Sequence, residues 1–172
     1  MNIDEIKKLI RDIPDFPKPG IIFRDITPVI GNARGFASVV DRLAEPYLGK
    51  VDIVMGIESR GFIVGAPVAY RLGVGFTIAR KPGKLPFHTV DQSYDLEYGS
   101  AALQMHQDGI PSDARVLIVD DLLATGGTAE AAAGLARQVG GQVIGCAFMI
   151  ELTALHGRER MAPLNCFSLI QY

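Results

Sequence analysis

The sequence lacks a long apolar run, an excess of charge of one sign and a cysteine pattern. No stretch approaches the roughly 18 apolar residues that a membrane-spanning helix needs. The 17 Lys and Arg residues nearly balance the 19 Asp and Glu residues, which disfavours a general nucleic-acid binder and a polybasic membrane anchor. The two cysteines, Cys146 and Cys166, lie among apolar residues and are too few for a disulfide framework. We therefore expect a cytosolic protein with buried, reduced thiols and with neither a nucleic-acid nor a membrane partner.

Several familiar site patterns are missing as well. His88, His106 and His156 do not have the spacing of metal ligands, so a zinc site is not expected. The G-x-S-x-G turn of α/β-hydrolases is absent, and basic residues do not alternate with aromatic ones as in single-strand binders. The first ten residues mix acidic and basic side chains and resemble neither a signal peptide nor a transit peptide. We therefore expect a cytoplasmic location.

What the sequence does contain is an alternation of apolar strands and amphipathic helices. A length of 172 residues predicts one domain. Continuous apolar runs predict strands, and apolar residues at helical spacing predict helices. The predicted strands are Val51–Ile57, Gly75–Ala79, Arg115–Val119, Val143–Ile150 and Phe167–Ile170, and the predicted helices are Ile3–Ile13, Phe36–Leu48, Gly61–Leu72 and Thr128–Val139. This alternation predicts an α/β fold with a mostly parallel central sheet and helices on both faces.

One segment breaks the alternation. Residues 81–101 include Pro82, Gly83, Pro86 and Gly99 among many polar side chains. A long excursion inside a compact domain is usually either functional or disordered. Side chains alternate between polar and apolar around residues 89–94 and 97–103, which predicts a hairpin that can act as a lid.

The most specific motif is VLIVDDLLATGGT, at positions 116–128. An apolar strand ends in Asp120 and Asp121, and a short turn leads through Thr125 to a helix that starts near Thr128. Helix N-termini expose unpaired N–H groups, and glycines let the backbone close around an anion. The motif therefore predicts a phosphate site, without the Gly-Lys-Ser/Thr ending of a P-loop. The paired acids suit ribose hydroxyls or a water-bound magnesium ion; alternatively, Thr128 only caps the helix and the acids make surface contacts.

Two further groups of polar residues lie beside predicted strands. Glu58, Ser59, Arg60 and Gly61 follow an apolar strand and precede a helix, and a guanidinium beside N–H groups suits a phosphate. The second group is basic and consists of Arg80, Lys81 and Lys84. Taken alone, the first group also fits an ordinary surface turn, and the second fits a solvated basic run.

The 116–128 motif resembles the signature with which type I phosphoribosyltransferases bind phosphoribosyl pyrophosphate (PRPP), and the resemblance extends over residues 16–172. It implies that Asp120 and Asp121 bind the ribose hydroxyls. It implies a 5′-phosphate site at Ala124, Thr125, Gly126, Gly127 and Thr128, and a pyrophosphate site at Glu58, Ser59, Arg60 and Lys81. It also implies an N-terminal hood at residues 1–30 and a flexible hairpin lid at residues 81–101. The lid would carry Arg80, Lys84 and Tyr98.

Two other motifs resemble those of the adenine-specific branch of this family. PGIIFRDITP, at positions 19–28, resembles its hood and implies that Ile22, Phe23 and Arg24 bind adenine, largely through backbone groups. The pair Glu97 and Tyr98 resembles its mobile loop, and implies that Glu97 is a catalytic acid or base. Relatives that act on hypoxanthine and guanine usually have aspartate at the position of Ala124. Enzymes for xanthine can also carry alanine there, so Ala124 alone does not decide the base. The resemblance of the hood and of the Glu97–Tyr98 pair favours adenine.

The resemblance implies a specific reaction, in which the 5-phosphoribosyl group of PRPP is transferred to adenine, giving AMP and pyrophosphate. It implies Mg²⁺ held through PRPP and waters without direct protein ligands, and a homodimer. Two alternatives are a phosphoribosyltransferase for xanthine or another base, and a PRPP-binding regulator. A regulator that binds nucleic acid would need a basic face or an added domain, and the sequence contains neither.

Overall fold

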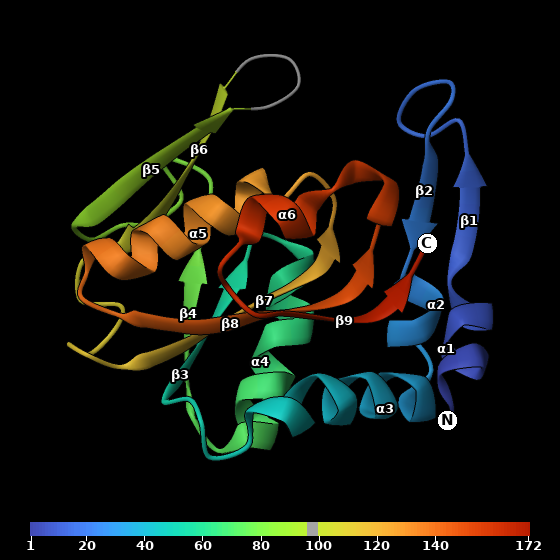
Figure 1. The fold of residues 1–172 in the computed structure, drawn as a ribbon, viewed down its shortest axis with the longest axis horizontal. Coiled ribbons are helices and arrows are strands. Elements are labelled where there is room, and N and C mark those ends of the chain that lie inside the picture. The colour runs from blue at the N-terminus through green and yellow to red at the C-terminus, as the bar shows by residue number, and fades with distance from the viewer. Residues whose placement is uncertain (96–99) are drawn as a thin grey trace.

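A five-stranded parallel sheet forms the centre of the fold in the computed structural model, which describes residues 1–95 and 100–172 (Figure 1). The strands are ordered β4-β3-β7-β8-β9 across the sheet. Their bounds are Ile53–Ile57 for β3, Gly75–Ala79 for β4, Arg115–Leu123 for β7, Gln142–Glu151 for β8 and Cys166–Gln171 for β9. The predicted parallel α/β sheet is confirmed, and every residue of β3 is buried, as expected where helices cover both faces.

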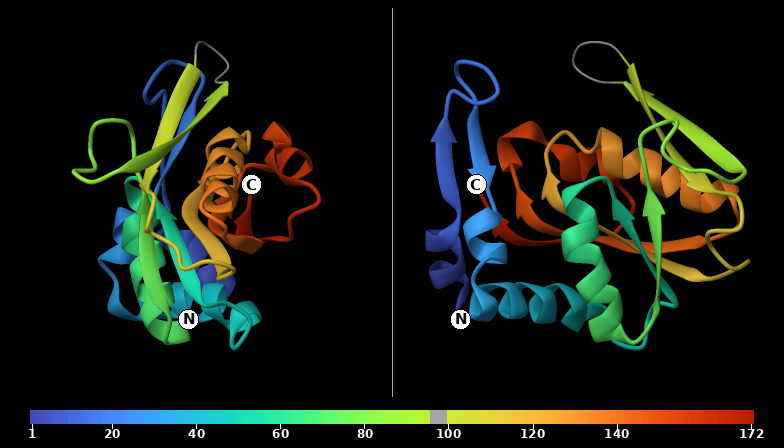
Figure 2. Two further views of the ribbon diagram at one scale, coloured as in Figure 1. Left: turned by 90° about the vertical axis from the view of Figure 1, so that its left-hand side faces the viewer. Right: turned by 180° about the vertical axis from the view of Figure 1, so that it is seen from behind.

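Helices cover the two faces of this sheet. Helices α3 (Ala33–Ala44) and α4 (Arg60–Leu72) pack on one face, and α5 (Gly127–Gln138) packs on the other (Figure 2). Successive strand residues point to opposite faces, so Val54 joins the core beneath α3 and α4 while Met55 joins the core beneath α5. Helix α4 ends at Gly73, which has a φ of 71° as its C-cap, and this end was predicted from the sequence.

The N-terminal segment folds differently from the prediction. The predicted helix over residues 3–13 is wrong in its second half, because α1 spans only Ile3–Leu9. Residues Arg11–Pro14 form strand β1, which pairs antiparallel with β2 (Ile22–Asp25) in a separate two-stranded sheet. The side chain of Asp25 accepts hydrogen bonds from the N–H and hydroxyl of Thr27, at 2.9 Å each, where the short helix α2 (Thr27–Ile30) begins. These elements make up the segment predicted to be the hood, and they stand beside the C-terminal strand β9 (Figure 1).

A second hairpin lies at the opposite end of the molecule. Strand β5 (Thr89–Asp95) pairs antiparallel with β6 (Ser100–His106), which confirms the predicted hairpin. The hairpin packs along α5, where the Gln138 side-chain amide donates to Gln92 Oε1 at 2.8 Å. The remaining elements are short: the 3₁₀ turns η1 (Glu45–Tyr47) and η2 (Thr153–Leu155), and helix α6 (Gly157–Met161).

The two cysteines face each other across β8 and β9. Cys146 pairs with Cys166 in the strand register, and both are buried free thiols, as the sequence predicted. Among residues 1–95 and 100–172, no helix combines the length and the apolar character required to span a bilayer.

Candidate functional site

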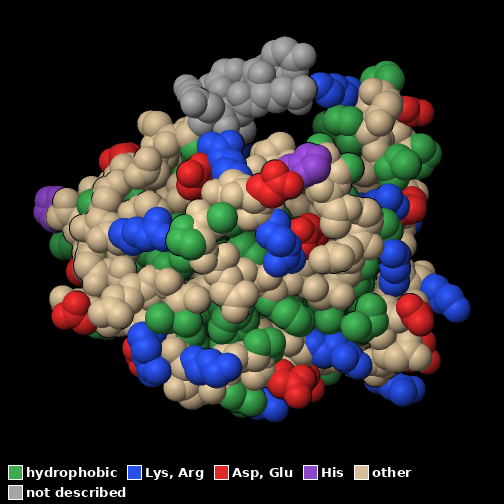
Figure 3. All heavy atoms as spheres, in the orientation of Figure 1, with side chains coloured by type: hydrophobic (Ala, Val, Ile, Leu, Met, Phe, Trp, Pro, Cys, Tyr) green, Lys and Arg blue, Asp and Glu red, His purple; other side chains and the backbone are tan. Residues whose placement is uncertain are grey.

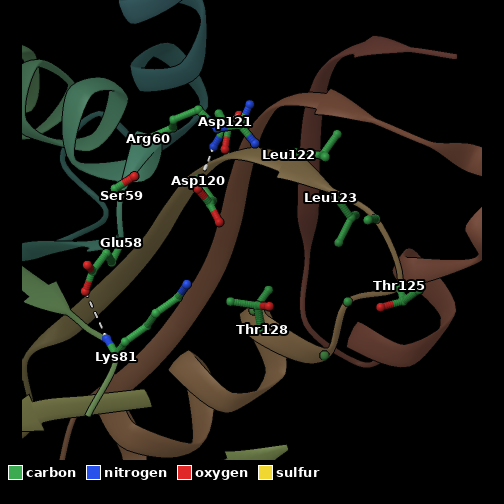
Figure 4. Close-up of a pocket in the computed structure, with 14 residues that line it drawn as sticks. Glu58, Ser59, Arg60, Lys81, Asp120, Asp121, Leu122, Leu123, Thr125 and Thr128 are labelled. Atoms are coloured by element: carbon green, nitrogen blue, oxygen red, sulfur yellow. Dashed lines mark hydrogen bonds and ion pairs between the residues drawn. The ribbon is translucent and has the colours of Figure 1, made fainter. Parts of the chain in front are cut away.

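A pocket of about 380 Å³ opens at the carboxyl ends of β3 and β7, where the sequence motifs meet (Figure 4). The carboxyl ends of parallel strands are the usual ligand sites of open α/β sheets. The pocket brings together residues from three separate stretches of the sequence. Its lining comprises Glu58, Ser59, Arg60, Lys81, Asp120, Asp121, Leu122, Leu123, Ala124, Thr125, Gly126, Gly127, Thr128 and Ala129.

The predicted phosphate turn lies at one end of this pocket. Strand β7 ends at Leu123, and α5 begins at Gly127 after a turn of three residues. Gly126 is the N-cap of α5 and has a φ of 84°, a conformation that glycine adopts without a steric penalty. The first turn of a helix leaves N–H groups without helical acceptors, so the turn presents donors and the positive end of the α5 dipole to the pocket.

The two adjacent acids come from β7 itself, because the strand continues through them instead of ending before them. The Asp121 side chain is buried, and its Oδ2 lies 3.1 Å from Nε of Arg60. The backbone N–H of Asp121 donates to Asp120 Oδ1 at 2.8 Å. Gly61, at the start of α4, packs so closely on Asp120 that a Cβ there would lie 2.8 Å from Asp120 Oδ1.

These contacts give the two carboxyls unusual acidities. Burial raises the pKa of Asp120 well above its ordinary value, and the neighbouring Asp121 raises it further. Burial also raises the pKa of Asp121, although the nearby Arg60 guanidinium opposes this shift. Burial makes the charged form of both carboxyls unfavourable. They therefore fit a site in which a ligand's hydroxyl groups donate hydrogen bonds to them and stabilise that charge.

Arg60 connects the pocket with the hood. Its guanidinium lies 5.0 Å from the ring centroid of Phe23 on β2, while its Nε pairs with Asp121. The side chain is about one-third exposed, at 34%, so it remains accessible to an anion in the pocket. The structure therefore places one guanidinium between the predicted base-binding strand and the predicted ribose site.

The basic segment after β4 is organised by Glu58. Arg80 donates to both carboxylate oxygens of Glu58, at 3.1 and 3.3 Å, and the Lys81 N–H donates to Oε2 at 3.0 Å. Burial acts to raise the pKa of Glu58, but these hydrogen bonds outweigh it and lower that pKa below its usual value. The Lys81 side chain extends into the pocket in Figure 4. Arg80 also donates to the Lys84 carbonyl at 3.3 Å. Neither Arg80 nor Lys84 is among the residues that line the pocket.

The hood residues lie next to the pocket without lining it. Arg24 pairs with Asp12 across β1 and β2, and its guanidinium lies 3.9 Å from the ring centroid of Tyr172. The Nζ of Lys7 lies 4.3 Å from the same ring. Ile22, which was predicted to bind the base through its backbone, has a side chain that is 51% exposed. Glu97 and Tyr98 lie outside the described residues, so their predicted roles stay predictions.

Sequence reasoning missed four residues of this region. Leu122, Leu123 and Ala129 line the pocket, and all three lie inside or next to the recognised motif. Gly157 lies directly behind the phosphate turn, yet it is 29 positions from the motif's last residue by the numbering of the sequence. No local pattern marks it, because its role depends on a contact between distant segments.

Comparisons with known proteins point to one family. The sequence profile of the family described as "Phosphoribosyl transferase domain" matches residues 27–172. An adenine phosphoribosyltransferase of Chloroflexus aurantiacus is 56% identical over 173 residues, covering 100% of both chains. The crystal structure of an adenine phosphoribosyltransferase from Thermoanaerobacter pseudethanolicus superposes with a TM-score of 0.97 at 50% identity, covering 99% of this chain and 100% of that one. The Saccharomyces cerevisiae adenine phosphoribosyltransferase, complexed with adenine and an imino-altritol bisphosphate, has a TM-score of 0.91 at 38% identity and 97% coverage of each chain.

Proposed function

The chain belongs to the phosphoribosyl transferase family, and on that premise we propose that it transfers the 5-phosphoribosyl group of PRPP to adenine, giving AMP and pyrophosphate. The observation that carries the proposal is the pocket at the ends of β3 and β7. It joins a helix-terminal phosphate turn, the buried Asp121 with the partly buried Asp120, and a basic side in one space. PRPP is a ligand with a phosphate, a pair of ribose hydroxyls and a pyrophosphate in matching order.

Each part of PRPP has a complementary partner. The 5′-phosphate accepts hydrogen bonds from the turn between Ala124 and Thr128, at the N-terminus of α5. The ribose hydroxyls donate to Asp120 and Asp121, which relieves the cost of their buried charge. The pyrophosphate lies toward Arg60 and Lys81, the cationic side chains of the pocket.

Adenine is assigned as the acceptor base from the relatives and the hood. The yeast relative has been crystallised with adenine. Adenine offers an N6 donor beside an N1 acceptor, which a carbonyl and an N–H of one extended strand can satisfy together. We assign these roles to backbone groups of Ile22 and Arg24 on β2, and the ring of Phe23 between them lies near the Arg60 guanidinium.

The chemistry is a displacement at the anomeric carbon of the ribose. Transition states of glycosyl transfer have oxocarbenium character, so the leaving pyrophosphate gains negative charge as the bond to C1 breaks. Arg60 and Lys81 stabilise that charge in the pocket. The hood and the β2 strand hold adenine in line with C1. Glu97 acts as an acid or base toward a proton on the purine. Closure of the lid, residues 81–101, keeps water from competing with adenine.

Magnesium accompanies PRPP in this proposal. The described residues contain no group of three or more His, Cys, Asp or Glu side chains arranged to hold a metal ion. We propose that the ion is held mainly by PRPP oxygens and waters. Asp120 and Asp121 provide oxygen atoms of the type that Mg²⁺ prefers. When bound, Mg²⁺ would neutralise charge on the pyrophosphate.

The alternative functions are less well supported. The relatives named for adenine do not favour xanthine or another base. A regulator that binds nucleic acid would need a basic surface, whereas acidic and basic side chains are interspersed on the face seen in Figure 3.

The assembly is proposed to be a homodimer in the cytoplasm. Helix α4 exposes Ile63, at 45%, and Tyr70, at 89%, and residues seven positions apart lie on one helix face. The buried free thiols of Cys146 and Cys166 fit a reducing compartment. Light scattering on the purified chain tests the dimer, and Tyr70→Glu is expected to lower the measured mass to that of one chain.

The reaction itself is tested by incubating the protein with PRPP, Mg²⁺ and adenine and measuring AMP and pyrophosphate. We expect equal amounts of the two products. The matched control is the double variant Asp120→Asn/Asp121→Asn, which keeps the shape of both side chains and removes both charges. A wild-type protein that makes no AMP, or a double variant that makes it at the wild-type rate, would contradict the proposal.

A further inference from the structure

The 5′-phosphate turn is supported from behind by a glycine outside the motif. Gly157, the first residue of α6, is buried. A Cβ built on Gly157 would lie 2.2 Å from the Ala124 carbonyl oxygen and 3.0 Å from the Gly126 nitrogen. Conversely, a Cβ built on Gly126 would lie 2.7 Å from the Gly157 carbonyl oxygen. The two segments therefore meet backbone against backbone, with no room for a side chain on either.

The two glycines are required for different reasons. Gly126 has a φ of +84°, so its backbone conformation alone favours glycine. Gly157 has no φ in that left-handed region, so any L-residue fits its backbone conformation. What excludes a side chain at Gly157 is only the space that the phosphate turn occupies. A methyl group there consequently tests the contact without forcing the backbone into a conformation that L-residues rarely adopt.

The segment that carries Gly157 is anchored to the sheet. Arg158 binds both carboxylate oxygens of Glu151, which is buried at the end of β8, and also donates to the Cys166 carbonyl. The Leu152 N–H donates to the Leu123 carbonyl at 2.9 Å, which links the segment to the last residue of β7. These anchors mean that a clash at Gly157 displaces the turn more readily than it displaces α6.

A fourth anchor joins α6 to the helix that follows the turn. Nε of Arg160 donates to Glu130 Oε2 at 2.6 Å, from α6 to the first turn of α5. The Arg160 Cβ also lies 3.4 Å from the position that a Gly126 Cβ would take. The turn thus follows the end of β7, faces the pocket on one side and packs against the α6 segment on the other.

We propose that Gly157 is a positioning residue for the 5′-phosphate turn: its missing side chain sets how far the Ala124–Gly126 backbone recedes, and thereby where the N–H donors point. This inference rests on the proposed function, because it takes the turn to bind the 5′-phosphate of PRPP. Gly157 itself touches no substrate in this account. It acts through the backbone of Ala124 and Gly126.

The test is to measure the binding of two partial ligands to Gly157→Ala. Ribose 5-phosphate depends on the turn, whereas pyrophosphate depends on the opposite side of the pocket near Arg60. We expect the dissociation constant of ribose 5-phosphate to rise roughly tenfold or more, and that of pyrophosphate to change by less than about twofold. In turnover assays, KM for PRPP should rise more than kcat falls. The matched control is Gly75→Ala in β4, whose Cβ would meet Ile53 at an ordinary 3.5 Å.

If Gly157→Ala does not fold, a second variant tests whether the α6 segment positions the phosphate turn. Arg160→Gln removes the link to the exposed Glu130 side chain without adding bulk, and should weaken ribose 5-phosphate binding about two- to fivefold with pyrophosphate unaffected. Equal effects on both ligands, or no effect in a folded variant, would overturn the positioning role alone. A wild-type protein that fails to bind ribose 5-phosphate would overturn the proposed function as well.

Discussion

Replacing Arg60 by alanine perturbs the pocket at its most connected side chain. The Arg60 guanidinium pairs with the buried Asp121 at 3.1 Å and lies 5.0 Å from the ring centroid of Phe23. In the ligand-free protein, Arg60→Ala leaves the Asp121 carboxylate buried without its cation. In the complex with PRPP, the same change removes charge-assisted hydrogen bonds to the pyrophosphate. Stability and binding should therefore both fall, by amounts that can be separated.

The stability loss follows from the exposure of the two partners. Losing a charged hydrogen-bond partner costs about 1.5–3 kcal/mol, and the 34% exposure of Arg60 reduces this to about 1–2 kcal/mol through solvent screening. For a chain of this length, that corresponds to a melting temperature lower by about 2–8 °C. The loss in binding is of similar origin, so kcat/KM for PRPP should fall roughly ten- to a hundredfold.

The assay combines thermal unfolding with initial rates at varied PRPP. Arg71→Ala is the matched control, because Arg71 lies on the same helix and pairs with Asp41 at the exposed surface; it should change neither quantity noticeably. The double variant Arg60→Ala/Asp121→Asn should recover stability, since the buried charge is gone, without recovering activity. A folded Arg60→Ala protein with kcat/KM within about twofold of wild type would refute the assignment of Arg60 to the site.

Three other predictions concern the hood, the acids and the lid. Tyr172→Ala removes the ring on which Arg24 and Lys7 rest, so KM for adenine should rise while KM for PRPP stays constant, and Tyr172→Phe should behave as wild type in the same kinetic assay. Burial raises the folded-state pKa of Asp120 above 3.8, so its charged carboxylate destabilises the fold at neutral pH. This penalty shrinks as the pH falls through the raised pKa and is gone below 3.8. Asp120→Asn should therefore be inactive, more stable than wild type in denaturant titrations at pH 7.5, and equally stable near pH 3.5. Glu97→Gln should lower kcat without changing the melting temperature, and wild-type turnover would remove Glu97 from the mechanism.

The central sheet was predictable because a buried parallel strand is apolar along its whole length. β3 shows this most clearly, because all of its residues are buried. β4 lies at the edge of the sheet and is only partly buried, yet it spans Gly75–Ala79 as predicted. The phosphate turn was predictable for a related reason. The paired acids, the glycines and the start of α5 are consecutive in the sequence, so their chemistry can be interpreted without knowing any distant contact. Of the predicted pocket residues, Asp120, Asp121 and the turn all line one space.

The features that could not be predicted depend on contacts between distant segments. Ile10 and Ile13 continue the helical spacing of α1, yet Arg11–Pro14 pairs with Ile22–Asp25, and this pairing overrides the local pattern. Asp120 and Asp121 remain inside β7 because Asp120 pairs with Phe148 of the neighbouring strand. The link between Arg60 and Phe23 joins the hood to the pocket, and nothing in the local sequence around either residue indicates it.

The most direct test of the account is a comparison of initial rates with PRPP, Mg²⁺ and adenine, hypoxanthine, guanine or xanthine. Efficient conversion of adenine alone is expected, because we assign backbone groups of Ile22 and Arg24 on β2 to its N6 donor and N1 acceptor. Efficient conversion of another base in place of adenine would contradict the assignment of the hood, while leaving the PRPP site intact. Binding of PRPP without turnover of any base would contradict the enzyme itself and favour a PRPP-binding regulator.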